Sequence, residues 1–127
     1  MTTSEKRRYP RVSLKVDDGY FGNFILPDNS KLMASIVNLS GGGVNFSVTP
    51  QAVELLKAGD VLLLKHIAGA AQLSFLEDIK AEICWIKVLE DPGMVSVGCG
   101  FLAIAPPVQE QLSRFIDAER TVRGQYD

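Results

Sequence analysis

The spacing of hydrophobic residues changes once along this chain, and the change restricts the folds that the chain can adopt. Before residue 106, apolar residues mostly recur at every second position, as Val44, Phe46 and Val48 do, which is the pattern of a half-buried strand. After Pro106-Pro107 they recur three or four positions apart, which is the pattern of an amphipathic helix. This helical stripe consists of Val108, Leu112, Phe115 and Ile116. We therefore predict strands followed by one helix over about residues 106–120, since proline is favourable at a helix start.

Turn-forming residues divide the first part of the chain into six or seven short strands. The predicted strands cover residues 12–16, 20–26, 31–39, 44–49, 60–67, 72–89 and 95–101, with a short helix within 50–57. Short strands at regular spacing with one terminal helix are typical of a small antiparallel barrel. A doubly wound α/β fold is disfavoured because strands and helices do not alternate along the chain.

Alternation also predicts which side chains share a face of each strand. The expected inward sets are Val12, Leu14 and Val16; Val44, Phe46 and Val48; Ile79, Ala81, Ile83 and Trp85; and Val95, Val97, Cys99 and Phe101. Residues 31–39 carry apolar side chains at both parities, so the sequence does not determine their buried face. Gly22 is expected to break the strand around it, Glu77-Asp78 to bend the long segment 72–89, and Asp91-Pro92-Gly93 to form a turn.

Composition limits the classes of partner. The chain has 127 residues, enough for one domain with a real core, and its formal net charge is −2. Without a general positive field we expect no DNA or RNA partner, and a nucleic-acid groove of the OB type is disfavoured because most aromatic residues alternate as core. No apolar run approaches the roughly 20 residues of a membrane span, and the N-terminus lacks a secretory signal. We therefore expect no membrane insertion and a cytoplasmic protein.

Catalytic chemistry finds little support in the sequence. His66 is the single histidine and lies within an apolar run. Ser40 lies in the sequence Asn-Leu-Ser-Gly-Gly, with Asn38 in place of the first glycine of the nucleophile elbow Gly-x-Ser-x-Gly. Cys84 and Cys99 are too few for a zinc site or a disulfide framework, so we expect reduced thiols on strands. We therefore predict no enzymatic activity, no metal and no cofactor.

The segment Lys6–Arg11 places four cations within six residues of an acidic chain. Pro10 disfavours a helix here because the residue before proline is excluded from the α region. We interpret residues 1–11 as an extended arm that is flexible when no ligand is bound. The planar fork of arginine matches both phosphate and the O6/N7 edge of guanine, so Arg7, Arg8 and Arg11 suit an anionic guanine nucleotide.

A second polar motif follows the third predicted strand, in the segment Asn38-Leu39-Ser40-Gly41-Gly42-Gly43. The Asn38 amide both donates and accepts hydrogen bonds, and the Ser40 hydroxyl can reach a phosphate or a base. Three consecutive glycines are poor strand interior and indicate a tight turn. They also let the backbone approach a ligand closely and direct N–H groups toward it.

Taken together and in this order, the two motifs resemble the signature of the PilZ domain family, Arg-x-x-x-Arg followed by Asp/Asn-x-Ser-x-x-Gly. The resemblance implies a mainly β fold, a six-stranded antiparallel barrel of the split-barrel type with a C-terminal α-helix, that binds the bacterial second messenger cyclic di-GMP. It implies that Arg7 and Arg11 clamp phosphate and guanine, that Asn38 and Ser40 read the base edge and the sugar-phosphate, and that Gly43 permits close approach. Lys6, just before the first motif, is suited to holding a second stacked ligand. The candidate ligand-binding residues are Lys6, Arg7, Arg8, Arg11, Asn38, Ser40, Gly41, Gly42 and Gly43.

The expected domains are the arm, residues 1–11, and a single barrel domain, residues 12–127. We expect ligand binding to order the arm, and an unidentified downstream protein to recognise the ordered arm. The alternative is a PilZ-like structural adaptor that binds no nucleotide. The apolar stripe of the terminal helix can be covered by the barrel or by a partner, so a homodimer is also possible.

Overall fold

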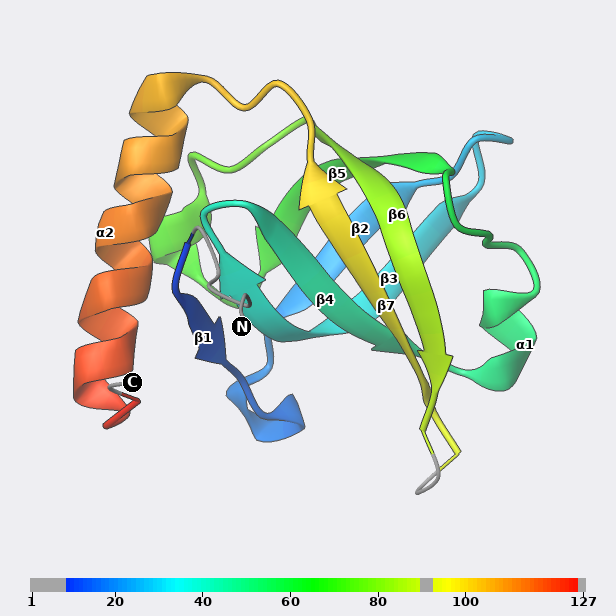
Figure 1. The fold of residues 1–127 in the computed structure, drawn as a ribbon, viewed down its shortest axis with the longest axis horizontal. Helices are drawn as coiled ribbons and strands as arrows, with labels where there is room; N and C mark the ends of the chain where they lie inside the picture. Colours follow the sequence, from blue (N-terminus) through cyan, green and yellow to red (C-terminus); the bar gives the residue numbers. More distant parts are fainter. Residues whose placement is uncertain (1–8, 90–92, 126–127) are drawn as a thin grey trace, which may run out of the picture.

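The computed structural model describes residues 9–89 and 93–125. The strands are β1 Arg11–Ser13, β2 Phe21–Ile25, β3 Lys31–Ser40, β4 Gly43–Val48, β5 Val61–Ala68, β6 Ile79–Val88 and β7 Val95–Phe101. The helices are α1 Pro50–Val53 and α2 Pro106–Val122, and two 3-10 turns are η1 Val16–Asp18 and η2 Ala71–Leu73. Figure 1 shows α2 standing beside the strands.

Six of these strands close into a barrel in the order β3-β2-β5-β6-β7-β4, and β4 pairs again with β3. Every pairing is antiparallel. The seventh strand, β1, pairs with the C-terminal half of β3, on the edge that β2 leaves free. This arrangement confirms the predicted mainly β fold, a six-stranded antiparallel barrel with a C-terminal helix.

The barrel interior follows the predicted alternation where the strands are regular. Val44, Phe46 and Val48 of β4 are buried, as are Val95 and Val97 of β7. The rings of Phe24 and Phe46 meet at the centre, with centroids 4.6 Å apart, a separation at which tilted aromatic rings attract one another. The core contains inward residues of all six barrel strands, and residues of β1, η2 and α2 pack on the same cluster.

Three strands change face part-way along their length, because each contains a β-bulge. In β5 the register with β2 shifts between Asn23 and Phe24, which places the extra residue at Lys65. In β3 the register shifts between Ile36 and Asn38, which places the extra residue at Val37. In β6 the shift lies between Ile83 and Trp85. The prediction that Trp85 points inward with Ile83 was therefore wrong, and its side chain is 41% exposed. A bulge inserts one residue into one strand and reverses the alternation beyond it.

Other differences are local. Strand β1 ends at Ser13, and Val16 opens η1 with 66% of its surface exposed, so its predicted inward position was wrong.

Gly22 does not break β2, and it pairs with Ala34 and Ile67. The predicted strand over residues 72–89 was wrong in its first part, because η2 ends at Leu73 and β6 begins only at Ile79. The interruption expected at Glu77-Asp78 is confirmed, because Asp78 has a φ of 54° immediately before β6. Asp91 and Pro92 of the predicted turn lie outside the described residues.

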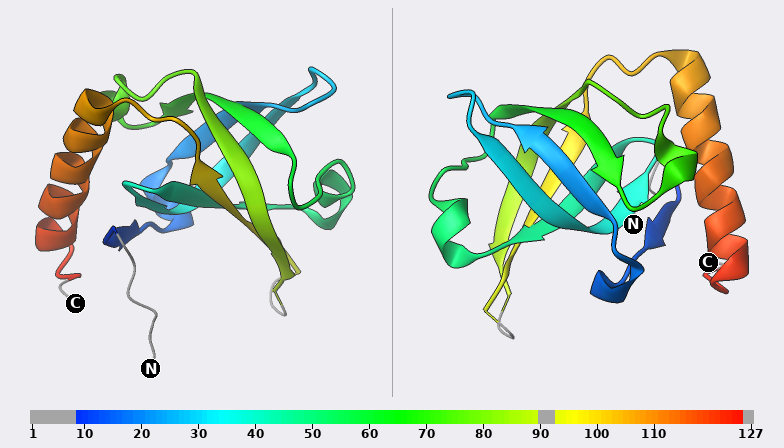
Figure 2. Two further views of the ribbon diagram at one scale, coloured as in Figure 1. Left: turned by 45° about the horizontal axis from the view of Figure 1, so that its top comes forward. Right: turned by 180° about the vertical axis from the view of Figure 1, so that it is seen from behind.

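Helix α2 packs across one end of the barrel, beside β1 and η2 (Figures 1 and 2). Leu112 and Ile116 of its apolar stripe are buried, and Val108 and Phe115 are half-buried against the same core. The stripe therefore packs on the barrel, and the helix extends two residues beyond the predicted end, to Val122. Among the described residues, no helix is both long and apolar enough to cross a membrane.

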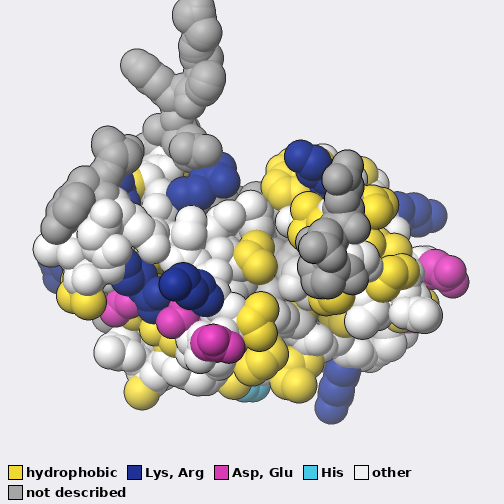
Figure 3. All heavy atoms as spheres, turned by 90° about the horizontal axis from the view of Figure 1, so that it is seen from below, with side chains coloured by type: hydrophobic (Ala, Val, Ile, Leu, Met, Phe, Trp, Pro, Cys, Tyr) yellow, Lys and Arg dark blue, Asp and Glu magenta, His cyan; other side chains and the backbone are white. Residues whose placement is uncertain are grey.

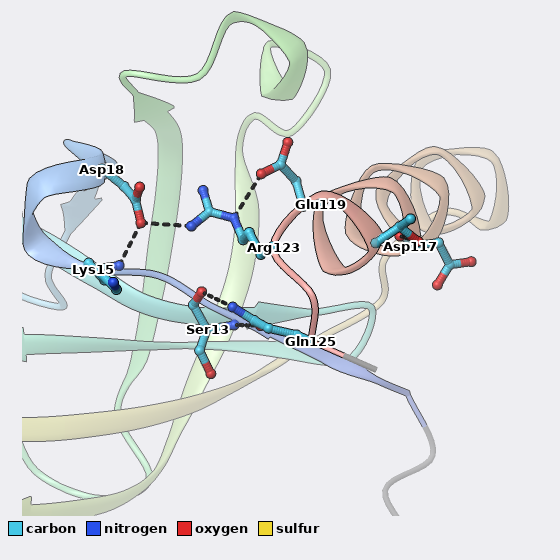
Figure 4. Close-up of polar contacts among 8 residues, drawn as sticks. Ser13, Lys15, Asp18, Asp117, Glu119, Arg123 and Gln125 are labelled. Carbon is cyan, nitrogen blue, oxygen red and sulfur yellow. Dashed lines mark hydrogen bonds and ion pairs between the residues drawn. The ribbon is translucent and has the colours of Figure 1, made fainter. Parts of the chain in front are cut away.

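The end of α2 is fixed to β1 and η1 by a set of polar contacts that we call the C-terminal clasp: Ser13, Asp18, Glu119, Arg123 and Gln125 (Figure 4). Arg123 contacts Asp18 through Nη1 and Glu119 through Nε, both at 2.9 Å. The Gln125 amide accepts from the Ser13 N–H at 2.8 Å and donates to the Ser13 carbonyl at 3.0 Å. In Figure 3, basic and acidic side chains lie next to one another on the α2 side of the molecule.

Candidate functional site

The polar residues of the two sequence motifs meet on the outer face of the barrel, where five strands lie side by side in the order β1-β3-β4-β7-β6. One row of paired residues crosses this face from Arg11 through Ser40, Gly43 and Gly100. The next row runs from Asn38 through Asn45 and Gly98 to Trp85. The register therefore brings together residues that are far apart in sequence.

The glycines in these rows leave a hollow of about 190 Å³ on the barrel surface. Gly98 and Gly100 on β7, with Gly43 on β4, form part of its floor because they carry no side chains. The lining residues are Arg11, Asn38, Ser40, Gly42, Gly43, Val44, Asn45, Cys84, Trp85, Gly98, Cys99 and Gly100. A ligand in the hollow would therefore lie directly against backbone.

Trp85 forms part of the β6 side of the hollow, and its indole lies over Gly98. A β-carbon at Gly98 would overlap the Cε2, Cζ2 and Nε1 atoms of the indole, so only glycine leaves room for this position. Because the bulge at Cys84 turns Trp85 outward, the indole is accessible as well as fixed. An exposed indole in a fixed position is a suitable surface for stacking a nucleobase.

The β1, β3 and β4 side of the hollow is polar. The bulge at Val37 turns both Asn38 and Ser40 outward, and Arg11 lies opposite Ser40 at the start of β1. Within residues 9–89 and 93–125, the side-chain amides of Asn38 and Asn45 make no hydrogen bond. Their donors and acceptors therefore have no protein partner in the described region and are available to a ligand.

The Gly41-Gly42 turn packs against Tyr9 and helix α2, whereas the sequence predicted that both glycines contact the ligand. Gly42 lines the hollow, but Gly41 does not. Both glycines lie against the ring of Tyr9, and the Gly41 carbonyl accepts a hydrogen bond from the Gln109 side chain of α2 at 3.0 Å. Gly43 is required for backbone packing, because a β-carbon there would overlap the carbonyl of Cys99.

Of the nine candidate residues, Arg11, Asn38, Ser40, Gly42 and Gly43 surround the hollow. Lys6, Arg7 and Arg8 lie outside the described residues. Sequence reasoning missed Asn45, Cys84, Trp85, Gly98 and Gly100. The alternation of glycine with Val97, Cys99 and Phe101 was a usable signal, because small residues on the outer side of a strand leave space for a neighbour or a ligand.

The two cysteines beside the hollow differ in their environment. Cys84 is exposed, whereas Cys99 is buried. Burial raises the pKa of the Cys99 thiol to about 12, with a smaller contribution from Cys84, so Cys99 is protonated at neutral pH.

The structure describes no group of three His, Cys, Asp or Glu side chains arranged for a metal ion within residues 9–89 and 93–125. His66 lies on β5, where its Nε2 is 3.3 Å from the Asn23 amide.

Comparison with known families agrees with the geometry. The model of the PilZ domain matches residues 5–118. The chain therefore belongs to the PilZ domain family. A comparison with curated proteins found no match to the chain.

Several solved structures are similar. The PilZ domain of YcgR from Escherichia coli, described with c-di-GMP, is 26% identical, with a TM-score of 0.72 over 95% of this chain and 97% of that chain. A longer YcgR chain in complex with c-di-GMP is 25% identical, with a TM-score of 0.69 over 94% of this chain and 49% of that chain. The Bacillus subtilis inhibitor of motility (MotI/DgrA) is 14% identical, with a TM-score of 0.71 over 97% of this chain and 55% of that chain. This last likeness shows the fold alone.

Proposed function

We propose that this chain binds cyclic di-GMP in the hollow between Arg11 and Trp85. The observation that carries the proposal is that residues of both sequence motifs and the exposed Trp85 indole line the same hollow. The similarity to a PilZ domain described with c-di-GMP supports the same ligand. Binding rather than catalysis is the function that these side chains suit, because they offer hydrogen-bond donors and a stacking surface.

The residues around the hollow suggest a role for each part of the ligand. The Arg11 guanidinium is placed to contact a phosphate or the O6/N7 edge of guanine. The Asn38 amide, which has no hydrogen-bond partner among the described residues, is placed to pair with a base edge. The Ser40 hydroxyl accepts from the Gly42 N–H at 3.1 Å and keeps its own proton to donate to a phosphate oxygen. The Trp85 indole is placed to stack on one guanine.

The volume of the hollow implies a role for the N-terminal arm. At about 190 Å³ the hollow is smaller than the roughly 300–1,000 Å³ of pockets that enclose drug-sized ligands. It suits one guanine and the adjoining phosphate, and leaves the other half of the ligand to residues 1–11. We infer that Arg7 and Arg8 close over this half and that the arm becomes ordered as they do so. Lys6 is suited to a second, stacked ligand.

An ordered arm would change the surface beside β1 and so present a new face to a partner protein.

Isothermal titration calorimetry with cyclic di-GMP, with GTP as the control ligand, tests the proposal and gives the stoichiometry. A good arginine–guanine pair is worth about 1–3 kcal/mol, so Arg11→Ala should weaken binding about ten- to a hundredfold. Equal binding by Arg11→Ala and wild type would contradict the proposed role of Arg11, and no binding by wild type would favour the non-binding adaptor.

The cysteines offer a second measurement at the same site. Cys84 is exposed at the rim of the hollow, and the high pKa of Cys99 keeps its thiol protonated and unreactive. Alkylation by iodoacetamide should therefore modify Cys84, and cyclic di-GMP should slow the reaction while GTP does not. Mass spectrometry of the modified peptides distinguishes the two cysteines. An unchanged rate at saturating ligand would place the ligand elsewhere.

A further inference from the structure

Tyr9 is the described residue that connects the arm to the glycine turn. A β-carbon at Gly41 would lie 3.0 Å from the Tyr9 Cδ1, and one at Gly42 would lie 2.9 Å from the Tyr9 Cδ2. The two glycines therefore meet opposite edges of the same ring, which spans the turn between β3 and β4. A β-carbon at Gly42 would force the ring to shift, and one at Gly41 would displace it by a few tenths of an ångström, so the ring packs this closely because both residues lack a side chain.

The turn under the ring is itself fixed. The Gln109 Nε2 of α2 donates to the Gly41 carbonyl at 3.0 Å, and the Ser113 Oγ would lie 3.3 Å from a β-carbon at Gly41. The Ser40 Oγ accepts from the Gly42 N–H. Helix α2 and β3 thus hold the turn from two sides, and Tyr9 packs on a rigid support.

We propose that Tyr9 is a positioning residue for the ligand: its ring anchors the arm on the Gly41-Gly42 turn and thereby places Arg11, which follows it in the chain, beside the hollow. This inference rests on the proposed function. Arg11 is two residues after Tyr9 and lines the hollow.

The anchor acts by preorganisation. An arm fixed at Tyr9 loses less conformational freedom when the ligand binds than an arm that is free up to β1, and affinity rises accordingly. Gly41 therefore contributes to affinity although it does not line the hollow. No φ in the left-handed region requires glycine at position 41, so its requirement comes from the Tyr9 ring and from Ser113.

Calorimetry on a mutant cycle tests the proposal with cyclic di-GMP as the ligand. Tyr9→Ala and Gly41→Ala should each raise the Kd about tenfold, and Tyr9→Phe should stay within about twofold of wild type, since it keeps the ring. In the Tyr9→Ala background, Gly41→Ala should have no further effect, because its effect passes through the ring. The unfolding midpoint of Tyr9→Phe should match that of wild type, and that of Tyr9→Ala, which loses the ring contacts, should stay above the temperature of the titration. Arg11→Ala provides the reference for a lost ligand contact.

A ligand-free measurement accompanies the cycle. The Tyr9 ring current should shift the Gly41 and Gly42 proton resonances in the NMR spectrum of wild type and of Tyr9→Phe, and the shifts should disappear in Tyr9→Ala. Additive effects of Tyr9→Ala and Gly41→Ala would show that Gly41 acts through Ser113 and would overturn the proposal, as would unchanged affinity in Tyr9→Ala. If wild type itself bound no cyclic di-GMP, the proposed function would fail and the positioning role with it. Binding by wild type, lost in Arg11→Ala but kept in Tyr9→Ala, would overturn this inference alone.

Discussion

The two ends of β1 meet two different polar regions. At its start, Arg11 borders a hollow in which the Asn38 and Asn45 amides have no hydrogen-bond partner among the described residues. Beyond its end, in the C-terminal clasp, Arg123 contacts two carboxylates and both polar atoms of the Gln125 amide are paired with Ser13. Polar groups that satisfy one another stabilise a fold, whereas polar groups arranged around an open hollow are available to a ligand. The comparison supports the proposed binding role of the first region and a structural role for the second.

Removing the indole should have the largest effect on the hollow. Stacking on an aromatic side chain is worth about 1–3 kcal/mol per base, so Trp85→Ala should weaken cyclic di-GMP binding about ten- to a hundredfold. Val88→Ala, on the same strand and 73% exposed, serves as the control and should bind like wild type. Calorimetry measures both. Equal affinity in Trp85→Ala would remove β6 from the binding region.

Substitutions of Gly98 and Gly100, two glycines of β7, test whether Gly98 determines the position of the Trp85 indole. A β-carbon at Gly98 would displace the Trp85 ring, whereas one at Gly100 would make an ordinary contact, 3.6 Å from the Cys84 sulfur. Gly98→Ala should therefore shift the tryptophan fluorescence, since Trp85 is the single tryptophan, and weaken binding about tenfold, within the range for a lost stacking contact. Gly100→Ala should leave the emission spectrum unchanged. Identical spectra for the two variants would show that Gly98 does not position the ring.

Substitutions in the C-terminal clasp should lower the stability of the fold and leave the affinity for cyclic di-GMP nearly unchanged. Arg123→Ala removes two ion pairs of a side chain that is 21% exposed and should cost about 1 kcal/mol of unfolding free energy, with little change in the Kd for cyclic di-GMP. Arg114→Ala removes an ion pair with Glu110 in which the side chains are 73% and 66% exposed and should cost less than about 0.5 kcal/mol. Denaturant titration and calorimetry give the two quantities. A large loss of affinity in Arg123→Ala would join the clasp to the binding region.

The smallest expected effect is the pH dependence of the clasp. The Lys15 N–H and then the Arg123 guanidinium lower the pKa of Asp18 from its usual value near 3.8. The stabilisation is therefore present above that usual value and is lost as the pH falls through the lower value of the folded state. Between pH 7 and pH 3, wild type should lose more stability than Asp18→Asn, as followed by denaturant midpoints. Equal losses would show that the Asp18 charge does not contribute.

The fold could be predicted because most strands keep a regular alternation. Val44, Phe46 and Val48 point inward as their spacing predicts, and the stripe of α2 packs on the barrel. The prediction for Val16 failed because β1 ends at Ser13, and the prediction for Trp85 failed because one residue is added to its strand. Nothing in the residue types of Val37 or Cys84 distinguishes a bulge from a regular strand position, because bulges depend on the register of the partner strand.

The same bulges explain which part of the site the sequence revealed. Arg11, Asn38, Ser40 and Gly43 belong to motifs and could be identified by residue type and order. Trp85 could not, because strict alternation places it in the core, and only the extra residue at Cys84 turns it to the hollow. The neighbours across the strands, such as Asn45, depend on cross-strand pairing that no local pattern specifies.

The side chain of Gln125 substitutes for a strand. Closing a barrel removes the exposed edges through which β-sheets join other sheets, but β1 lies outside the closed ring and keeps an outer edge. The Gln125 amide gives the Ser13 backbone the donor and acceptor that a neighbouring strand would supply. A second chain could add to β1 there only by displacing this amide, so one side chain protects the molecule against edge-to-edge aggregation.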